Sequence, residues 1–126
     1  MSKERKYIVN SSRFKGGNLM NINDTKLIFV ISPSDNDKQE DVVKEIINQL
    51  IKDDKKNRRE DAVYVNALNT FNWLSNIVDK DDLINHYLKL LTKCDELYVL
   101  PNYELDEVCS QCLGIAKILD LPITYL

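Results

Sequence analysis

Four short apolar runs, separated by segments with helical spacing, constrain the fold of this sequence more than any other feature. The first run, residues 27–32, is unbroken and rich in β-favouring residues, and strands that are apolar on both faces belong to sheets covered by helices on both sides. Pro33 ends this run because proline cannot donate a hydrogen bond to a strand ladder. Similar runs at 62–66, 96–100 and 122–126 predict three further strands.

Between these runs, apolar side chains recur every three or four residues, as in an amphipathic helix. This spacing predicts helices over residues 42–51, from about Asp81 to residue 91, and over 105–119. Residues 67–78 are expected to form a short helix or a packed loop, and the charged segment 55–59 a solvated loop.

Strands that alternate with helices pair in parallel. We therefore predict one three-layer α/β domain over residues 27–126, with about four parallel strands in the order 2-1-3-4 and helices on both faces. This is a Rossmann-like, flavodoxin-like arrangement. The apolar strand residues expected to be mostly buried are Ile28, Val30, Val63, Val65, Leu97 and Val99.

The charge is uneven along the chain. Residues 1–26 hold six Lys/Arg and two Asp/Glu, a net charge of +4, whereas residues 27–126 hold 11 and 18, a net charge of −7. With its Gly, Ser and Asn residues, segment 1–26 is expected to be a flexible basic arm that contributes little to folding. The overall charge of −3 and the pI of about 5.2 argue against general nucleic-acid binding.

The sequence also predicts where the protein resides. The N-terminus has no apolar run of the secretory type. No stretch approaches the roughly 20 apolar residues of a membrane span. Three cysteines are too few, and odd in number, for a disulfide framework. We therefore expect a cytoplasmic protein with no membrane contact.

Polar side chains follow the predicted strands at their carboxyl ends. Parallel open sheets bind ligands there, at the point where the strand order reverses. In the predicted order, that crevice lies between the first and third strands. Among the acidic candidates Asp35, Asp37, Glu104 and Glu107, Glu104 is the best placed, and Trp73 is an aromatic candidate for the pocket lining. The side chains predicted to bind the ligand are Ser32, Ser34, Asn66, Asn102, Tyr103 and Glu104.

Three other features allow more than one interpretation. Cys109 and Cys112 form a CxxC pair on the apolar stripe of the last helix, where core packing, a redox or metal role, and a ligand-facing Cys112 are the alternatives. Gly114 lies inside the same helix at a cost of about 1 kcal/mol relative to alanine, which indicates either tight packing or close approach of another group. His86, the single histidine, lies off its helix stripe and is expected at the surface.

The C-terminal part of the chain resembles a known family. The segments Leu97-Tyr-Val-Leu-Pro-Asn-Tyr-Glu104, Cys112-Leu-Gly-Ile-Ala116 and Leu121-Pro-Ile123 resemble the nucleoside 2-deoxyribosyltransferases. They are still more similar to a small, mostly uncharacterised bacterial and phage branch with that fold. The resemblance extends over residues 27–126 and is most specific in the C-terminal third. It implies a nucleoside or ribosyl ligand and homo-oligomers in which neighbouring subunits complete each pocket.

The resemblance also identifies a departure. In the transferases, the glutamate that opens the motif Glu-Leu-Gly-Tyr-Ala is the nucleophile that forms a glycosyl-enzyme ester. Cys112 occupies this position, so the resemblance implies that Cys112 faces the ligand and that the catalytic carboxylate is missing.

Three functions follow from these observations. The first is a protein that binds a nucleoside, nucleotide or related ribosyl molecule without turnover, as a sensor or by sequestering it. The second is an N-glycoside hydrolase or deoxyribosyltransferase that uses another carboxylate, Glu104. The third is a protein–protein interaction module. No cofactor is expected, since a Gly-rich phosphate loop is missing, and no metal, since one histidine and one CxxC form no adequate ligand set.

Overall fold

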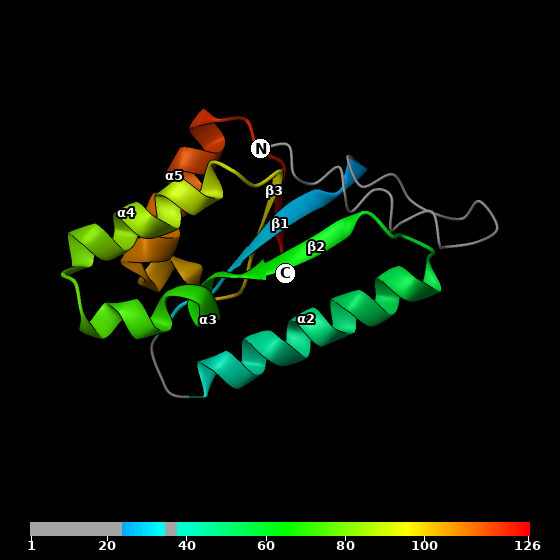
Figure 1. Cartoon of the computed structure of the whole chain (residues 1–126), viewed down its shortest axis with the longest axis horizontal. Coiled ribbons are helices and arrows are strands. Elements are labelled where there is room, and N and C mark those ends of the chain that lie inside the picture. Colours follow the sequence, from blue (N-terminus) through cyan, green and yellow to red (C-terminus); the bar gives the residue numbers. More distant parts are fainter. Residues whose placement is uncertain (1–23, 35–37) are drawn as a thin grey trace, which may run out of the picture.

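The predicted alternation of strands and helices is present in the structure. The structure is a computed structural model that describes residues 24–34 and 38–126, and Figure 1 shows the arrangement of its elements. The elements run in the order β1 (Lys26–Ile31), α2 (Gln39–Lys56), β2 (Ala62–Asn66), α3 (Ala67–Phe71), the 3-10 helix η2 (Asn72–Asn76), α4 (Lys80–Leu91), β3 (Glu96–Val99), the 3-10 helix η3 (Tyr103–Leu105), α5 (Glu107–Ile118) and β4 (Ile123–Tyr125).

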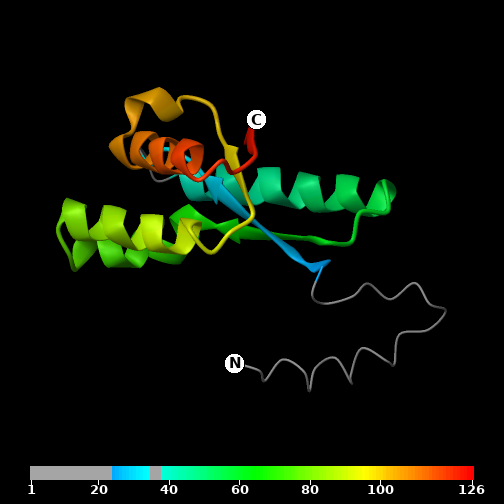
Figure 2. The ribbon, with the colours of Figure 1, turned by 90° about the horizontal axis from the view of Figure 1, so that it is seen from above.

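The four strands form one parallel sheet in the order β2-β1-β3-β4, which confirms the predicted topology. Phe29 of β1 is level with Val65 of β2 and Leu97 of β3. All strands therefore finish at the same edge, which we call the carboxyl edge. Figure 2 shows the β1 arrow pointing toward the end of the molecule at which α2, α4 and α5 begin.

Apolar side chains on the two faces of the sheet form two separate cores. Phe29 and Leu97 belong to a cluster with buried residues of α4 and α5, such as Leu91 and Cys112. The alternate strand residues belong to a second cluster with Val43 of α2. This is the three-layer arrangement expected for strands that are apolar on both faces. Buried strand residues of the second cluster are Ile28, Val30 and Tyr98.

The predicted burial is confirmed for four of the six strand residues, whereas Val65 is only partly buried. Ile28, Val30, Leu97 and Val99 are fully or almost fully buried, as expected. Val63, however, is 46% exposed. It lies on β2, which ends the sheet in the observed strand order, so that only one neighbouring strand shields its side chain.

Polar side chains determine where two helices begin. The carboxylate of Asp79 accepts a hydrogen bond from the backbone N–H of Asp82 at 2.9 Å, so α4 begins at Lys80, slightly before the predicted start. Asp106 likewise caps α5 by accepting from the N–H of Cys109 at 3.0 Å. The prediction that this helix includes Leu105 is therefore wrong.

The loop after α2 is shorter than predicted. Residues 55 and 56 still belong to α2, and Asn57 is the C-cap of this helix. Arg59, which was expected in a solvated loop, forms ion pairs with Asp61 and Glu96. Within the described residues, no helix combines the length and apolar character needed to cross a bilayer. The arm predicted at residues 1–26 lies almost wholly outside the described residues.

Candidate functional site

The sheet topology brings two of the predicted ligand-binding segments together. Ile31 at the end of β1 pairs with Val99 at the end of β3. The backbone N–H of Leu100 also donates to the carbonyl oxygen of Ile31 at 3.0 Å, which keeps the two chains adjacent beyond the strands. Segments 32–34 and 101–104 therefore leave the sheet side by side at the switch point of the strand order.

The residues that leave β1 offer few free polar groups. The side chain of Ser32 is buried, and its hydroxyl donates to the adjacent carbonyl oxygen of Pro33 at 3.3 Å. Ser34 is exposed. Asp35 and Asp37 lie outside the described residues, so their predicted roles stay predictions.

Asn102 offers an exposed hydrogen-bonding group at the switch point. It is exposed and has a φ of 67°, in the left-handed region that asparagine tolerates better than most residues. This backbone conformation turns the chain from β3 into η3. Its side-chain amide forms no hydrogen bond with any described residue, so a donor and an acceptor are available to a ligand.

Two tyrosines form a pair at the same edge of the sheet. The ring centroids of Tyr103 in η3 and Tyr125 in β4 are 5.5 Å apart, with their planes at 41°. Tyr103 is half-buried against the α4–α5 core, whereas Tyr125 is 53% exposed. The pair presents an aromatic surface at the carboxyl ends of β3 and β4. Tyr103 was predicted at this edge and Tyr125 was not, although Tyr125 lies two residues after Ile123 and shares its face of the strand.

The other two predicted polar residues differ in their availability. Glu104 is exposed, next to Tyr103. Asn66, at the end of β2, caps α3, since its side-chain oxygen accepts from the N–H of Asn69 at 3.1 Å. Asn66 lies level with Val30 of β1 and is thus on the other side of the switch point from Asn102.

Cys112 lies in the core. Cys109 and Cys112 are both completely buried in the cluster between the sheet, α4 and α5, and both are free thiols. Burial raises the pKa of Cys112 to about 12, and the neighbouring carboxylate of Asp106 adds to the increase. A buried, protonated thiol is a poor nucleophile and a poor metal ligand. Core packing is thus the interpretation that the structure supports, and the thiol does not reach the surface of the carboxyl edge.

The remaining candidates lie at the surface in different places. His86 is exposed, as predicted, and its Nδ1 lies 2.8 Å from the carbonyl oxygen of Asp82. Trp73 is exposed and donates from Nε1 to the carbonyl oxygen of Thr70. Glu107 pairs with Lys80 at 3.0 Å. In the described part of the chain, no three His, Cys, Asp or Glu side chains are grouped so as to hold a metal ion.

The surroundings of Gly114 contradict one of the two expectations. Gly114 is exposed on the outer side of α5, and a Cβ added there would meet no atom within 4 Å. Tight packing within the described chain therefore does not account for this glycine, and the close approach of a group from outside the chain stays a prediction.

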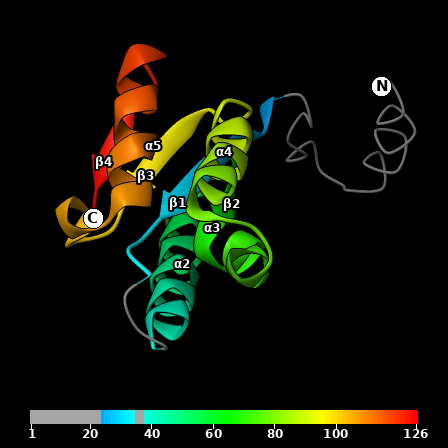
Figure 3. The same ribbon diagram turned by 90° about the vertical axis from the view of Figure 1, so that its left-hand side faces the viewer.

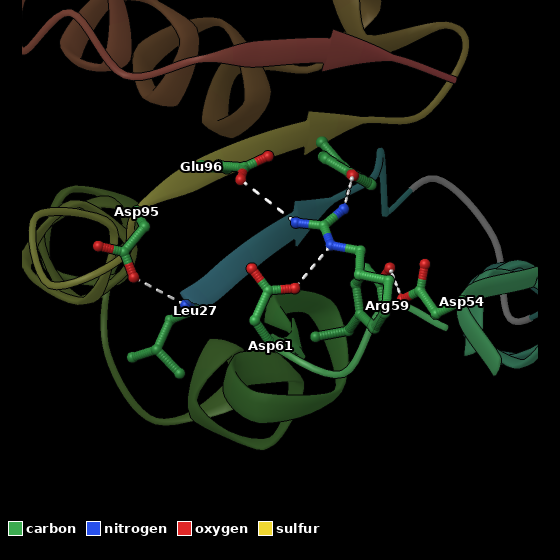
Figure 4. Close-up of polar contacts among 8 residues, drawn as sticks. Leu27, Asp54, Arg59, Asp61, Asp95 and Glu96 are labelled. Atoms are coloured by element: carbon green, nitrogen blue, oxygen red, sulfur yellow. Dashed lines mark hydrogen bonds and ion pairs between the residues drawn. The ribbon is translucent and has the colours of Figure 1, made fainter. Parts of the chain in front are cut away.

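A charged network, missed by sequence reasoning, lies at the opposite end of the sheet (Figure 4). Nε of Arg59 lies 2.9 Å from the carboxylate of Asp61, and its terminal nitrogens lie 3.5 Å from Glu96 and from the hydroxyl of Tyr98. The hydrogen bond from Arg59 lowers the pKa of Asp61. Arg59 precedes β2 and reaches β3, so it connects the two strands across β1.

Two further contacts complete this end of the sheet. Asp95 accepts from the N–H of Leu27 at 2.8 Å, and the hydroxyl of Tyr64 donates to Asp54 at 2.5 Å. Burial, followed by this hydrogen bond, raises the pKa of Tyr64 above its ordinary value. Because the charged groups are paired with one another, the network is suited to holding strands together rather than to binding a ligand.

Comparisons with known proteins gave no match among family models, curated proteins or solved structures.

Proposed function

We propose that this protein binds a nucleoside, nucleotide or related ribosyl molecule at the carboxyl edge, between β1 and β3, without converting it. The observation that carries the proposal is the aromatic pair of half-buried Tyr103 and exposed Tyr125, in which Tyr103 follows Asn102 with its free amide at the switch point. The resemblance of residues 97–123 to the deoxyribosyltransferases points to the same class of ligand.

The chemistry of these groups suits a nucleobase attached to a sugar. Stacking of a base on an aromatic side chain contributes about 1–3 kcal/mol to the binding free energy, as measured by replacing that side chain with alanine. The amide of Asn102 has donors and an acceptor that match the edge of a base, and Glu104 is an acceptor for sugar hydroxyls. Binding without turnover is proposed because the position that the resemblance assigns to the nucleophile holds Cys112, and a buried thiol cannot supply the negative charge that stabilises an oxocarbenium-like transition state.

The first experiment is isothermal titration calorimetry of the full chain with a panel of nucleosides and nucleotides. Binding of at least one member is expected, and free ribose and free bases serve as component controls. Tyr125→Ala should weaken that binding by roughly tenfold through the lost stacking. Leu105→Ser is a matched control, since Leu105 is 87% exposed in the same segment but offers no aromatic ring.

The second experiment tests for turnover. Release of free base, followed by liquid chromatography during prolonged incubation, should stay at the level of the buffer blank. Multiple-turnover release that Glu104→Gln abolishes would instead establish the N-glycoside hydrolase or transferase. Failure of every ligand to bind would refute the proposed function and favour an interaction module.

A further inference from the structure

The last strand of the sheet has an open side. β4 pairs with β3 alone, and in the described part of the chain no other strand pairs with it. The carbonyl of Pro122 and the N–H of Leu126 both bond to β3. Backbone groups alternate between the two sides of a strand, so those of Ile123 and Tyr125 point away from β3. Such an open row of donors and acceptors is a template for pairing with another strand.

Helix α5 lies beside this open strand, and the two elements form one side of the molecule (Figure 3). Ile118, at the end of the helix, is 76% exposed, and the neighbouring Leu119 is also exposed. Gly114 has open space where its side chain would be, although glycine is a poor helix former. Apolar exposure and an uncrowded glycine on one helix suit close approach of a second helix.

The charges of α5 are arranged for pairing with a copy of itself. Glu107 and Lys117 are both exposed and stand at opposite ends of the helix, five residues to either side of Cys112. When two copies of α5 lie antiparallel, each Glu107 is level with the Lys117 of the other copy. Among the described residues Lys117 forms no ion pair, whereas Glu107 contacts only Lys80, through an exposed pair.

The two-fold axis that relates two antiparallel copies of α5 also suits the pairing of two β4 strands. An antiparallel pair of β4 strands centred on Thr124 places Ile123 opposite Tyr125 of the other copy, and each such pair exchanges two backbone hydrogen bonds. The middle of α5 packs over this level of the sheet, because Cys112 shares a core cluster with Leu97, the β3 partner of Ile123. One two-fold axis therefore pairs the two β4 strands and the two α5 helices at the same time, as in the self-complementary interface of an isologous dimer.

We propose that the surface formed by β4 and the outer side of α5 binds a second copy of this chain in a two-fold dimer. The two sheets join through antiparallel β4 strands into one eight-stranded sheet, and the two α5 helices cross near Gly114. This inference shares Tyr125 with the proposed ligand site, but its test, the mass of the chain in solution, needs no ligand.

The test is the mass of the full chain in solution, measured by light scattering over a series of concentrations. The expected mass is twice the monomer value of 14.6 kDa. Thr124→Lys should give a monomer, because the two-fold axis brings the two lysines directly opposite each other. Gly114→Arg should also give a monomer, and its far-UV circular dichroism should stay native, since the folded chain has room for the side chain.

Two matched controls address the location of the interface. Val63→Lys places the same charge on the exposed side of the other edge strand, and Asn85→Arg adds arginine to an exposed position of α4. Both variants should remain dimers. A wild type that stays monomeric overturns the proposal, and so does dissociation by Val63→Lys together with a dimeric Thr124→Lys.

A charge swap tests the helix pairing. Lys117→Glu should raise the dimer dissociation constant about fivefold. Adding Glu107→Lys together with Lys80→Glu, which reverses the Lys80–Glu107 pair within the chain, should restore the wild-type value because the two charges across the interface then exchange places. The same increase in the single and the triple variant would contradict the antiparallel pairing of α5.

Discussion

Replacing Cys112 by glutamate tests whether this position belongs to the core or faces a ligand, as the family resemblance implies. The thiol is completely buried, so the larger side chain should cost about 1–3 kcal/mol through overpacking at any pH. The carboxylate adds a second, pH-dependent cost, because an acid in an apolar core binds its proton more tightly than in the unfolded chain.

The second cost can be estimated. If burial raises the pKa of the new glutamate from about 4.3 to about 8, the penalty at pH 8 is about 5 kcal/mol and that at pH 5 about 1 kcal/mol. The folded state then holds more protons than the unfolded state between these pKa values, so the stability of the variant falls as the pH rises. The free energy of unfolding of Cys112→Glu, relative to wild type, should therefore be about 4 kcal/mol lower at pH 8 than at pH 5.

Urea unfolding at pH 5, 6.5 and 8, followed by circular dichroism, measures this difference. Gln111→Glu is the control, since Gln111 is the adjacent residue and is exposed. Its effect should stay within about 0.5 kcal/mol at each pH. A cost below about 1 kcal/mol at pH 8 would refute the core position. Release of base from nucleosides by the Cys112→Glu variant would show instead that the position faces the ligand, as in the transferases.

Three further predictions concern stability. Arg59→Met should cost about 1–2 kcal/mol in urea unfolding at pH 7, because the carboxylate of Asp61 loses a charge-assisted hydrogen bond while remaining partly solvated. Since Arg59 lowers the pKa of Asp61 in the folded state, the contribution of this pair to the free energy of unfolding is fully present above a pH of about 4 and should disappear as Asp61 is protonated at lower pH. If Arg59→Met costs the same free energy down to pH 2, the pairing is contradicted. Asn102→Gly should be neutral or slightly stabilising, and Asn102→Ala should cost about 1 kcal/mol, because the φ of 67° favours glycine; equal thermal midpoints for the two variants would contradict the backbone assignment. Asp106→Ala should cost about 1 kcal/mol through loss of the cap on the N–H of Cys109, whereas Asp106→Asn should retain most of that stability when both are measured by thermal unfolding.

The sequence alone determined the architecture. Runs apolar on both faces, alternating with helical stripes, can be covered only by helices on both sides, and strands joined by a helical crossover pair in parallel. This reasoning predicted the strand order and placed Ser32 and Asn102 at neighbouring strand ends. It also favoured a core position for Cys109 and Cys112 from their place on the apolar stripe of α5.

Only the tertiary structure decided how individual side chains are used. The predicted strand order already placed residues 62–66 at an edge of the sheet, but the apolar run gave no sign that Val63 would be exposed and Val65 partly buried. The pairing of Arg59 with Asp61 and Glu96 joins residues up to 37 positions apart, and a charged loop gives no local sign of it. The same holds for Tyr125, whose ring meets Tyr103 only because β4 adds to β3. Periodicity reports which face of an element is apolar, whereas contacts between elements depend on the order in which they assemble.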